Sequence, residues 1–221
     1  MYVLTIDQRG SSTDVDRVPE LISDLAGLTL AAFERSVGDE LQGLVADPAE
    51  VVDIALHTLR GGHWYVGIGI GTVVLAPGAS PREGAGTGFV AARKAVDLAK
   101  TAAGHVPLSV VSGSIGRTAE VPQPAREGAV ACANAEAVLR LIGRLVQDRT
   151  DAQWRVVDLL RRLQDGGGRH GSQKLVAKEL GITEQSVSRA VLRSGWQEEW
   201  AARPAAAMLL QHAHSQIEGD R

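Results

Sequence analysis

Residues 37–44, which read VGDELQGL, decide how the N-terminal part of the chain is interpreted. A Gly-Asp pair is favourable in a turn, because glycine accepts a positive φ and aspartate can hydrogen-bond to nearby backbone. Short apolar runs flank the pair, AFERSV before it and LQGLVAD after it. We therefore predict a tight β-hairpin whose tip carries the carboxylates of Asp39 and Glu40.

Strand-like and helix-like segments alternate around this hairpin. An apolar, β-branched run predicts a buried strand at residues 2–6, and apolar residues at helical spacing predict a helix at 19–32. Asp47 and Pro48 suit the N-cap and first helical position of a helix at 47–59. Further strands are predicted at 64–75 and 106–112, and further helices at 89–102 and 125–147. The alternation predicts an α+β fold for this part of the chain.

Three glycines, Gly67, Gly69 and Gly71, alternate within the predicted strand at 64–75. The spacing is superficially that of a dinucleotide-binding fingerprint, but that motif belongs at a strand-to-helix turn and not inside a strand. We interpret these glycines as positions where another backbone approaches the strand closely.

The chain changes character after residue 148, where only helices are predicted. A helix at 152–164 ends at three glycines, and two short helices and a final helical run to about residue 216 follow. Residues 1–150 hold 13 Lys and Arg against 17 Asp and Glu, whereas residues 155–193 hold 8 against 4. We place a domain boundary near residue 150, so that an acidic domain at 1–150 precedes a more basic domain at 151–221.

The segment 173–192, QKLVAKELGITEQSVSRAVL, has the pattern of two helices that cross at a tight turn. Ala177 is small enough to let the second helix approach, Gly181 permits a positive φ at the turn, and Val187 packs back onto the first helix. Thr183 is a good N-cap for the second helix. In these positions the segment resembles the helix-turn-helix of DNA-binding proteins.

The resemblance implies that the second helix enters the major groove and that flanking residues contact phosphate. The candidate DNA-binding residues are Ser172, Lys174, Thr183, Gln185, Ser186, Ser188, Arg189 and Arg193. Glu184 would also lie on this face. The excess of basic residues favours DNA, because phosphate contacts supply most non-specific affinity. The alternative is a helical hairpin that serves only packing or dimerisation.

Two carboxylates, Asp7 at the end of the first strand and Asp39 on the hairpin, could converge from neighbouring strands. Mg²⁺ prefers such oxygen ligands, and a loop of small residues at positions 10–12 could offer backbone N–H groups to phosphate. Arg93 on the helix at 89–102 adds a basic side chain. Together they predict a site for Mg²⁺ and a nucleotide. Taken singly, each aspartate is more simply a cap or turn residue.

Four segments in order, TIDQRGSS, ERSVGDELQGLVADP, WYVGIGIGTV and GFVAARKAVDLA, resemble a known family. Residues 1 to about 115 are similar to the catalytic domain of class III nucleotidyl cyclases and, more distantly, to GGDEF diguanylate cyclases and polymerase palms. The hairpin, the GIGIG strand and the FxxAR helix are most similar to the SatD-type family of small bacterial proteins. This resemblance implies a cyclase-like or palm-like sandwich with an antiparallel-rich sheet, followed by the helix-turn-helix domain.

The resemblance also implies roles for individual residues. Asp7 and Asp39 match the two metal-binding aspartates. The nucleotide- and phosphate-binding positions are Gln8, Arg9, Gly10, Ser11, Ser12, Gly38 and Arg93. Phe89, however, stands where class III cyclases carry an asparagine that orients the ribose. Because phenylalanine cannot hydrogen-bond to a ribose, cyclase activity is disfavoured.

Bulk composition excludes several classes of protein. The chain of 221 residues has a net charge of -3 and predicts neither a signal peptide nor a membrane span. Its one cysteine, Cys132, cannot form an internal disulfide and is expected to be a buried small residue, which favours the cytoplasm.

We expect a cytoplasmic, nucleotide-responsive transcription regulator that binds DNA as a homodimer. One recognition helix reads few bases, and two-fold dimers read paired half-sites. The nucleotide could be linear or cyclic. The first alternative is an active nucleotidyl cyclase or nucleotidyltransferase with a regulatory C-terminal domain. The second is a DNA-binding protein whose cyclase-like domain is a dimerisation scaffold without a ligand.

Overall fold

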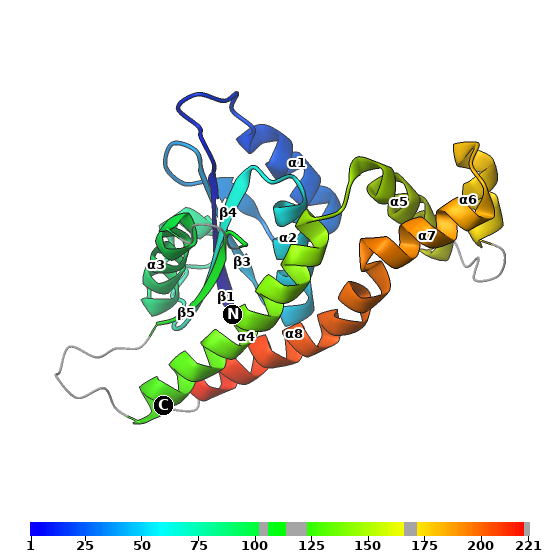
Figure 1. The fold of residues 1–221 in the computed structure, drawn as a ribbon. Helices are drawn as coiled ribbons and strands as arrows, with labels where there is room; N and C mark the ends of the chain where they lie inside the picture. Colours follow the sequence, from blue (N-terminus) through cyan, green and yellow to red (C-terminus); the bar gives the residue numbers. More distant parts are fainter. Residues whose placement is uncertain (102–105, 114–122, 166–171, 219–221) are drawn as a thin grey trace. The chain divides into compact units, whose positions relative to one another are not determined.

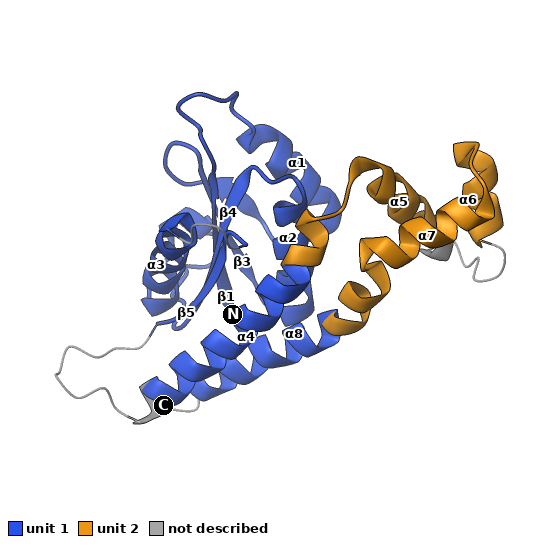
Figure 2. Ribbon diagram, viewed as in Figure 1, with its two compact units in different colours: residues 1–143, 203–221 blue, residues 144–202 orange. Residues whose placement is uncertain are grey.

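The computed structural model describes residues 1–101, 106–113, 123–165 and 172–218. The chain divides into two compact units, one of residues 1–143 and 203–221 and the other of residues 144–202 (Figure 2). The sequence pattern placed the boundary near residue 150 and assigned the whole C-terminus to the second domain. In the structure residues 203–221 belong to the first unit, because the end of the last helix packs there.

A five-stranded sheet forms the centre of the first unit. Its strands are β1 (Tyr2–Gln8), β2 (Phe33–Arg35), β3 (Glu40–Val45), β4 (Trp64–Ile70) and β5 (Leu108–Ser112), in the order β2-β3-β1-β4-β5. All neighbours pair antiparallel except β4 and β5, which are parallel. The order β-α-β-β-α-β with β1 between β3 and β4 is a split β-α-β arrangement, to which β5 is added. The predicted α+β class is confirmed.

The helices of the first unit cover both faces of this sheet. They are α1 (Val18–Leu28), α2 (Pro48–Arg60), α3 (Thr87–Thr101) and α4 (Gln123–Gln147), with a short 3₁₀ turn, η1 (Pro81–Glu83). α3 lies on one face and α1 and α2 on the other (Figure 1). Every residue of β1 is therefore buried.

Several predicted boundaries differ from the observed ones for local reasons. The helix predicted to end at residue 32 ends at Leu28, because Thr29 is extended and its hydroxyl donates to Glu50 of α2. The strand predicted to reach residue 75 ends at Ile70. Beyond it, Thr72 and Thr87 exchange reciprocal backbone-to-hydroxyl hydrogen bonds that tie the chain to the start of α3. The predicted caps of α2, Asp47 and Pro48, are confirmed.

The alternating glycines of β4 let α3 pack directly onto the sheet. A Cβ added to Gly67 would lie 2.4 Å from the Val96 nitrogen, and one added to Gly69 would lie 2.2 Å from the Gly88 oxygen. No larger residue fits without moving the helix. The predicted close backbone approach is confirmed, and it fixes the position of α3 relative to β1 and β4.

The last helix, α8 (Trp196–Glu218), contributes its second half to the first unit. This half runs beside α4 (Figure 2), where Ile217 contacts the α4 backbone at Gly128. Arg203 forms an ion pair with Asp53 of α2. Cys132 of α4 is buried as expected, and burial with the nearby Glu136 carboxylate raises the pKa of its thiol to about 12.

Every regular element among the described residues of the second unit is a helix. It contains α5 (Asp151–Asp165), α6 (Ser172–Leu180), α7 (Glu184–Ser194) and the first turns of α8. Its core is one apolar cluster that includes Val157, Val176, Val187 and Trp196. Beside it, the Arg149 guanidinium forms a fully buried ion pair with Glu199 at 3.0 Å and donates to the Ser194 carbonyl.

No helix among the described residues combines the length and the apolar character needed to cross a membrane.

Candidate functional site

Two buried carboxylates face each other where β1 ends and β3 begins. Asp7 and Glu40 are partners in the β1–β3 ladder, and the two residues are only 7% and 4% exposed. Side chains directly opposite in an antiparallel pair share one face of the sheet. This face is covered by α3, which approaches β4 through the glycines.

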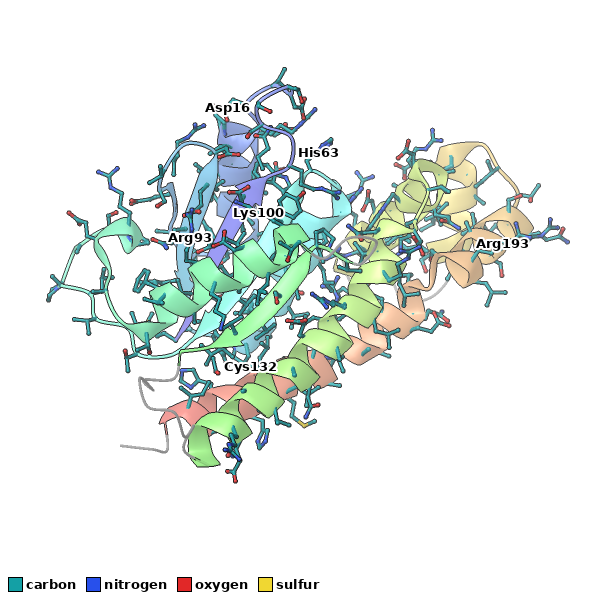
Figure 3. All side chains as sticks on the ribbon, turned by 60° about the vertical axis from the view of Figure 1, so that its left-hand side comes forward. Asp16, His63, Arg93, Lys100, Cys132 and Arg193 are labelled. Atoms are coloured by element: carbon teal, nitrogen blue, oxygen red, sulfur yellow. The ribbon has the colours of Figure 1, made fainter. Side chains whose placement is uncertain are left out.

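Helix α3 supplies one cation to each carboxylate. Lys100 Nζ donates to Asp7 Oδ2 at 2.7 Å, and the Arg93 guanidinium forms an ion pair with Glu40. Arg93 and Lys100 are seven residues apart, so two helical turns bring them onto the same side of α3 (Figure 3). The side chains of Lys100 and Arg93 are 34% and 55% exposed. The result is a cluster of two buried acids and two partly exposed bases.

Burial is the largest influence on the pKa of both acids. Loss of hydration raises the pKa of Asp7 above its ordinary value, although the hydrogen bond and charge of Lys100 oppose this and the charge of Asp39 adds to it. Burial likewise raises the pKa of Glu40, against the attraction of Arg93. Asp39 is thus close enough to Asp7 for the two carboxylates to repel, even though it does not pair with Asp7 across the ladder.

The predicted hairpin is present, with β2 and β3 joined by residues 36–39. Gly38 has φ +60°, as the turn requires, and its carbonyl accepts from Arg35 at 2.8 Å. Asp39 is half-buried, and its carbonyl accepts from the Gln8 N–H at 3.3 Å. Asp39 belongs to the turn, whereas Glu40 is the first residue of β3. The carboxylate directly opposite Asp7 is therefore that of Glu40.

Five of the seven predicted phosphate-binding residues lie at the end of β1 and in the loop that follows it, and two of these five are held by other contacts. The buried Gln8 side chain donates to the Val15 carbonyl and accepts from the Arg17 N–H, so it holds the loop in shape. Arg9 lies over the Tyr65 ring, 5.2 Å from its centroid, and donates to the Gly62 carbonyl.

The middle of this loop is a turn around Gly10. Gly10 has φ +66°, and its carbonyl accepts from the N–H groups of Thr13 and Asp14. Ser11 and Ser12 are exposed at the tip. Arg9, Gly10 and Gly38 are exposed as well, and the Arg93 side chain is 55% exposed, so Gln8 is the one buried member of the predicted set.

Phe89 has a packing role that the sequence did not reveal. Its ring covers Gly84, where an added Cβ would lie only 2.0 Å from the ring. The side chain thus anchors the first turn of α3 to the segment that follows η1.

The residues fit Mg²⁺ in part. Asp7, Asp39 and Glu40 offer the oxygen ligands that this ion prefers, and Mg²⁺ commonly uses one or two carboxylates together with substrate phosphates and water. Bound there, the ion would neutralise phosphate charge. However, Lys100 and Arg93 already occupy oxygens of two of these carboxylates. In the parts of the chain that are described, no three His, Cys, Asp or Glu side chains gather as a group that could hold a metal.

A separate cleft of about 350 Å³ lies between α1, the end of α2 and the start of β4. Arg17, His57, Arg60 and His63 line it together with Glu20 and Asp24. The predicted nucleotide-binding residues are not part of its lining. The cleft is therefore distinct from the carboxylate cluster.

In the second unit, α6 and α7 are joined by a three-residue turn. Gly181 has φ +64°, and Thr183 caps α7 by accepting from the Ser186 N–H at 3.1 Å. Ala177 and Val187 are buried in the common core, as their spacing predicts. Ile182 lies in the turn and is exposed.

The outer surface of this helix pair carries most of the predicted DNA-binding residues. Ser172 is half-buried at the start of α6; the exposed ones are Lys174, Thr183, Gln185, Ser186, Ser188, Arg189 and Arg193. Arg193 points away from the unit (Figure 3). Neither Arg189 nor Arg193 forms an ion pair with another residue that the structure describes.

The sequence thus located Asp7, Asp39 and Arg93 near one another but missed the contribution of Lys100. The available signal was its spacing of seven residues from Arg93 on a helix expected to cover the sheet. Comparisons with protein-family models, with curated proteins and with solved structures find no match for this chain.

Proposed function

We propose that the protein is a nucleotide-responsive transcription regulator, which acts in the cytoplasm as a homodimer and binds DNA through α6 and α7. The observation that carries this proposal is the exposed face of α7. Gln185, Ser188 and Arg189 lie on it, opposite the buried Val187. Such a helix, held on a tight turn, has the form of the recognition helix of a helix-turn-helix.

The chemistry of this face suits the major groove. Arginine can donate two hydrogen bonds to guanine, and glutamine can pair with adenine in the same way. Arg193 lies one turn after Arg189 and would reach phosphate. Since the helix-to-helix packing is already satisfied by the buried core, these polar side chains are not needed for folding.

The first unit is proposed to sense the nucleotide. In a cyclase-like site, Asp7 and Asp39 would hold Mg²⁺, with Glu40 beside them, and Arg93 would contact phosphate. Gly10, Ser11, Ser12 and Gly38 would offer backbone or hydroxyl groups, while Gln8 and Arg9 shape the loop. Catalysis is not part of the proposal, because Phe89 packs on Gly84 and offers a ribose no hydrogen bond.

A second candidate is a DNA-binding protein whose first unit takes no ligand. One observation favours it: Lys100 and Arg93 already neutralise Asp7 and Glu40, so the carboxylate cluster is electrostatically complete without a metal. Ligand binding distinguishes the two candidates.

DNA binding is tested by selecting bound sequences from a random duplex library and titrating the selected duplex in mobility-shift assays. Arg189→Ala should relax the sequence preference by about 1–3 kcal/mol at one base pair. Arg193→Ala should weaken binding to all sequences and reduce the salt slope by about 1. Lys94→Ala, an exposed cation on α3, is the matched control. If both arginine variants bind like wild type, α7 is not the recognition helix.

The nucleotide is tested by calorimetric titration of ATP, GTP and cyclic AMP with and without Mg²⁺. Asp39→Asn should remove the part of the affinity that depends on Mg²⁺ and leave DNA binding unchanged. Absence of binding for all three nucleotides in wild type would replace the proposal with the ligand-free alternative.

A further inference from the structure

Lys100 already pairs with the carboxylate that a metal at Asp7 would use. Its ammonium lies 2.7 Å from Asp7 Oδ2, which is direct contact between opposite charges. The Asp7 carboxylate is buried and already has this cation as its partner. A divalent ion could bind Asp7 without excess positive charge only if Lys100 left.

The position of Lys100 permits such an exchange. The residue lies in the last turn of α3, and a third of its side chain is exposed. Four methylene groups let the ammonium swing into water without any movement of the backbone. Arg93, by contrast, holds Glu40 from the middle of the helix, so the second half of the cluster stays neutral during the exchange.

The close packing of α3 on β4 fixes the contact between Lys100 and Asp7. The backbone approach at Gly67 and Gly69 fixes the helix on β4, and this in turn fixes the reach of Lys100 to β1. Asp39 lies close enough to Asp7 to repel it electrostatically. When Lys100 leaves, these two carboxylates together attract a cation.

We propose that Lys100 is a tethered competitor of the metal: it holds Asp7 when the site is empty and is displaced when Mg²⁺ binds. This inference rests on the proposed function, because it assumes that Asp7 is a metal ligand. The lysine sets the affinity of the site and keeps the buried carboxylate neutralised in the ligand-free protein. Once displaced, its ammonium lies beside the site and is available to a phosphate group of the nucleotide.

The test is calorimetric titration of Mg²⁺ alone into the full chain at mildly alkaline pH, where the carboxyls are ionised. Lys100→Met keeps the length of the side chain and removes its charge, so it should bind Mg²⁺ about 10-fold to 100-fold more tightly than wild type. Lys100→Arg retains the cation and should bind like wild type. Lys94→Met, on the exposed face of the same helix, is the control for overall charge.

A second readout follows the lysine itself. Acetylation of wild type by an amine-reactive ester, resolved by peptide mass spectrometry, should modify Lys100 slowly without Mg²⁺ and faster with saturating Mg²⁺. Lys94 should react at the same rate in both conditions. This comparison needs no variant, so it holds even if Lys100→Met unfolds.

The outcomes distinguish the metal site at Asp7 from the role of Lys100 as its competitor. If wild type and Lys100→Met bind Mg²⁺ equally, Asp7→Asn does not bind it, and acetylation of Lys100 is unchanged by the ion, the metal site stands and the role of Lys100 is refuted. If no variant binds Mg²⁺, or if Asp7→Asn binds it as well as wild type, the metal site at Asp7 is refuted, and so is the role of Lys100.

Discussion

Replacing Gly69 by alanine should destabilise the first unit, because β4 and α3 touch at backbone distance there. The new Cβ would lie 2.2 Å from the Gly88 oxygen and 2.3 Å from the Ala92 nitrogen. Non-bonded heavy atoms normally lie about 3.5 Å apart, so α3 would have to retreat by about 1 Å. Neither obstacle is the end of a flexible side chain, and the strain cannot be relieved by a change of rotamer.

The expected loss is at the upper end of the range for overpacked cores, about 3 kcal/mol. Alanine also lowers the conformational entropy of the unfolded chain, which stabilises the folded state by about 0.4–1 kcal/mol. The net decrease in the free energy of unfolding is therefore about 2 kcal/mol. Urea unfolding followed by circular dichroism measures this difference. Since a displaced α3 carries Arg93 and Lys100 away from β1 and β3, the acetylation rate of Lys100 should rise at the same time.

Gly27 provides the matched control. It lies on the exposed side of α1, and an added Cβ would meet nothing within 4 Å. Gly27→Ala should therefore stabilise the protein by up to about 1 kcal/mol through helix propensity. If Gly69→Ala is as stable as wild type while Gly27→Ala behaves as expected, α3 does not approach β4 as closely as described.

Three further changes test other features of the two units. The Thr5 hydroxyl is fully buried and has no hydrogen-bond partner among the described residues, so Thr5→Val should raise the free energy of unfolding by about 1 kcal/mol in urea titrations; a loss of stability would mean that the hydroxyl is bonded. Arg149→Met should destabilise the second unit by about 3 kcal/mol because the buried Glu199 carboxylate loses this cation, and the double variant with Glu199→Leu should recover much of the loss in thermal unfolding; no recovery would contradict a charge effect. Burial raises the pKa of Asp7 and Glu40 above their ordinary values of 3.8 and 4.5, so the folded chain binds these protons more tightly than the unfolded chain, and stability should fall as the pH rises from about 4 through the folded values. Asp7→Asn should flatten that fall in urea midpoints measured across the pH range, and an unchanged slope would exclude Asp7 as its source.

The sequence by itself determined features that depend on neighbouring residues. A short apolar, β-branched run located β1, turn chemistry located the hairpin, and the alternation of strand-like and helix-like segments predicted the α+β class. The N-cap of α2 followed from Asp47 and Pro48, and the turn between α6 and α7 followed from Gly181 and Thr183. These signals are local, because caps, turns and periodicity are set by backbone geometry within a few residues. The glycines of β4 were also interpreted correctly, since only a close neighbour explains them within a buried strand.

Only the tertiary structure decided which side chains meet. Asp7 faces Glu40 and not Asp39 because a shift of one residue in register moves a side chain to the opposite face, and the hairpin sequence does not specify where the turn ends and the ladder begins. Lys100 reaches Asp7 across 93 positions in the chain, and the second half of α8 returns to the first unit. Arg149 and Glu199 find each other in the same way. Such pairs form because whole helices and strands pack together, and contacts between distant segments leave no pattern in the sequence near either partner.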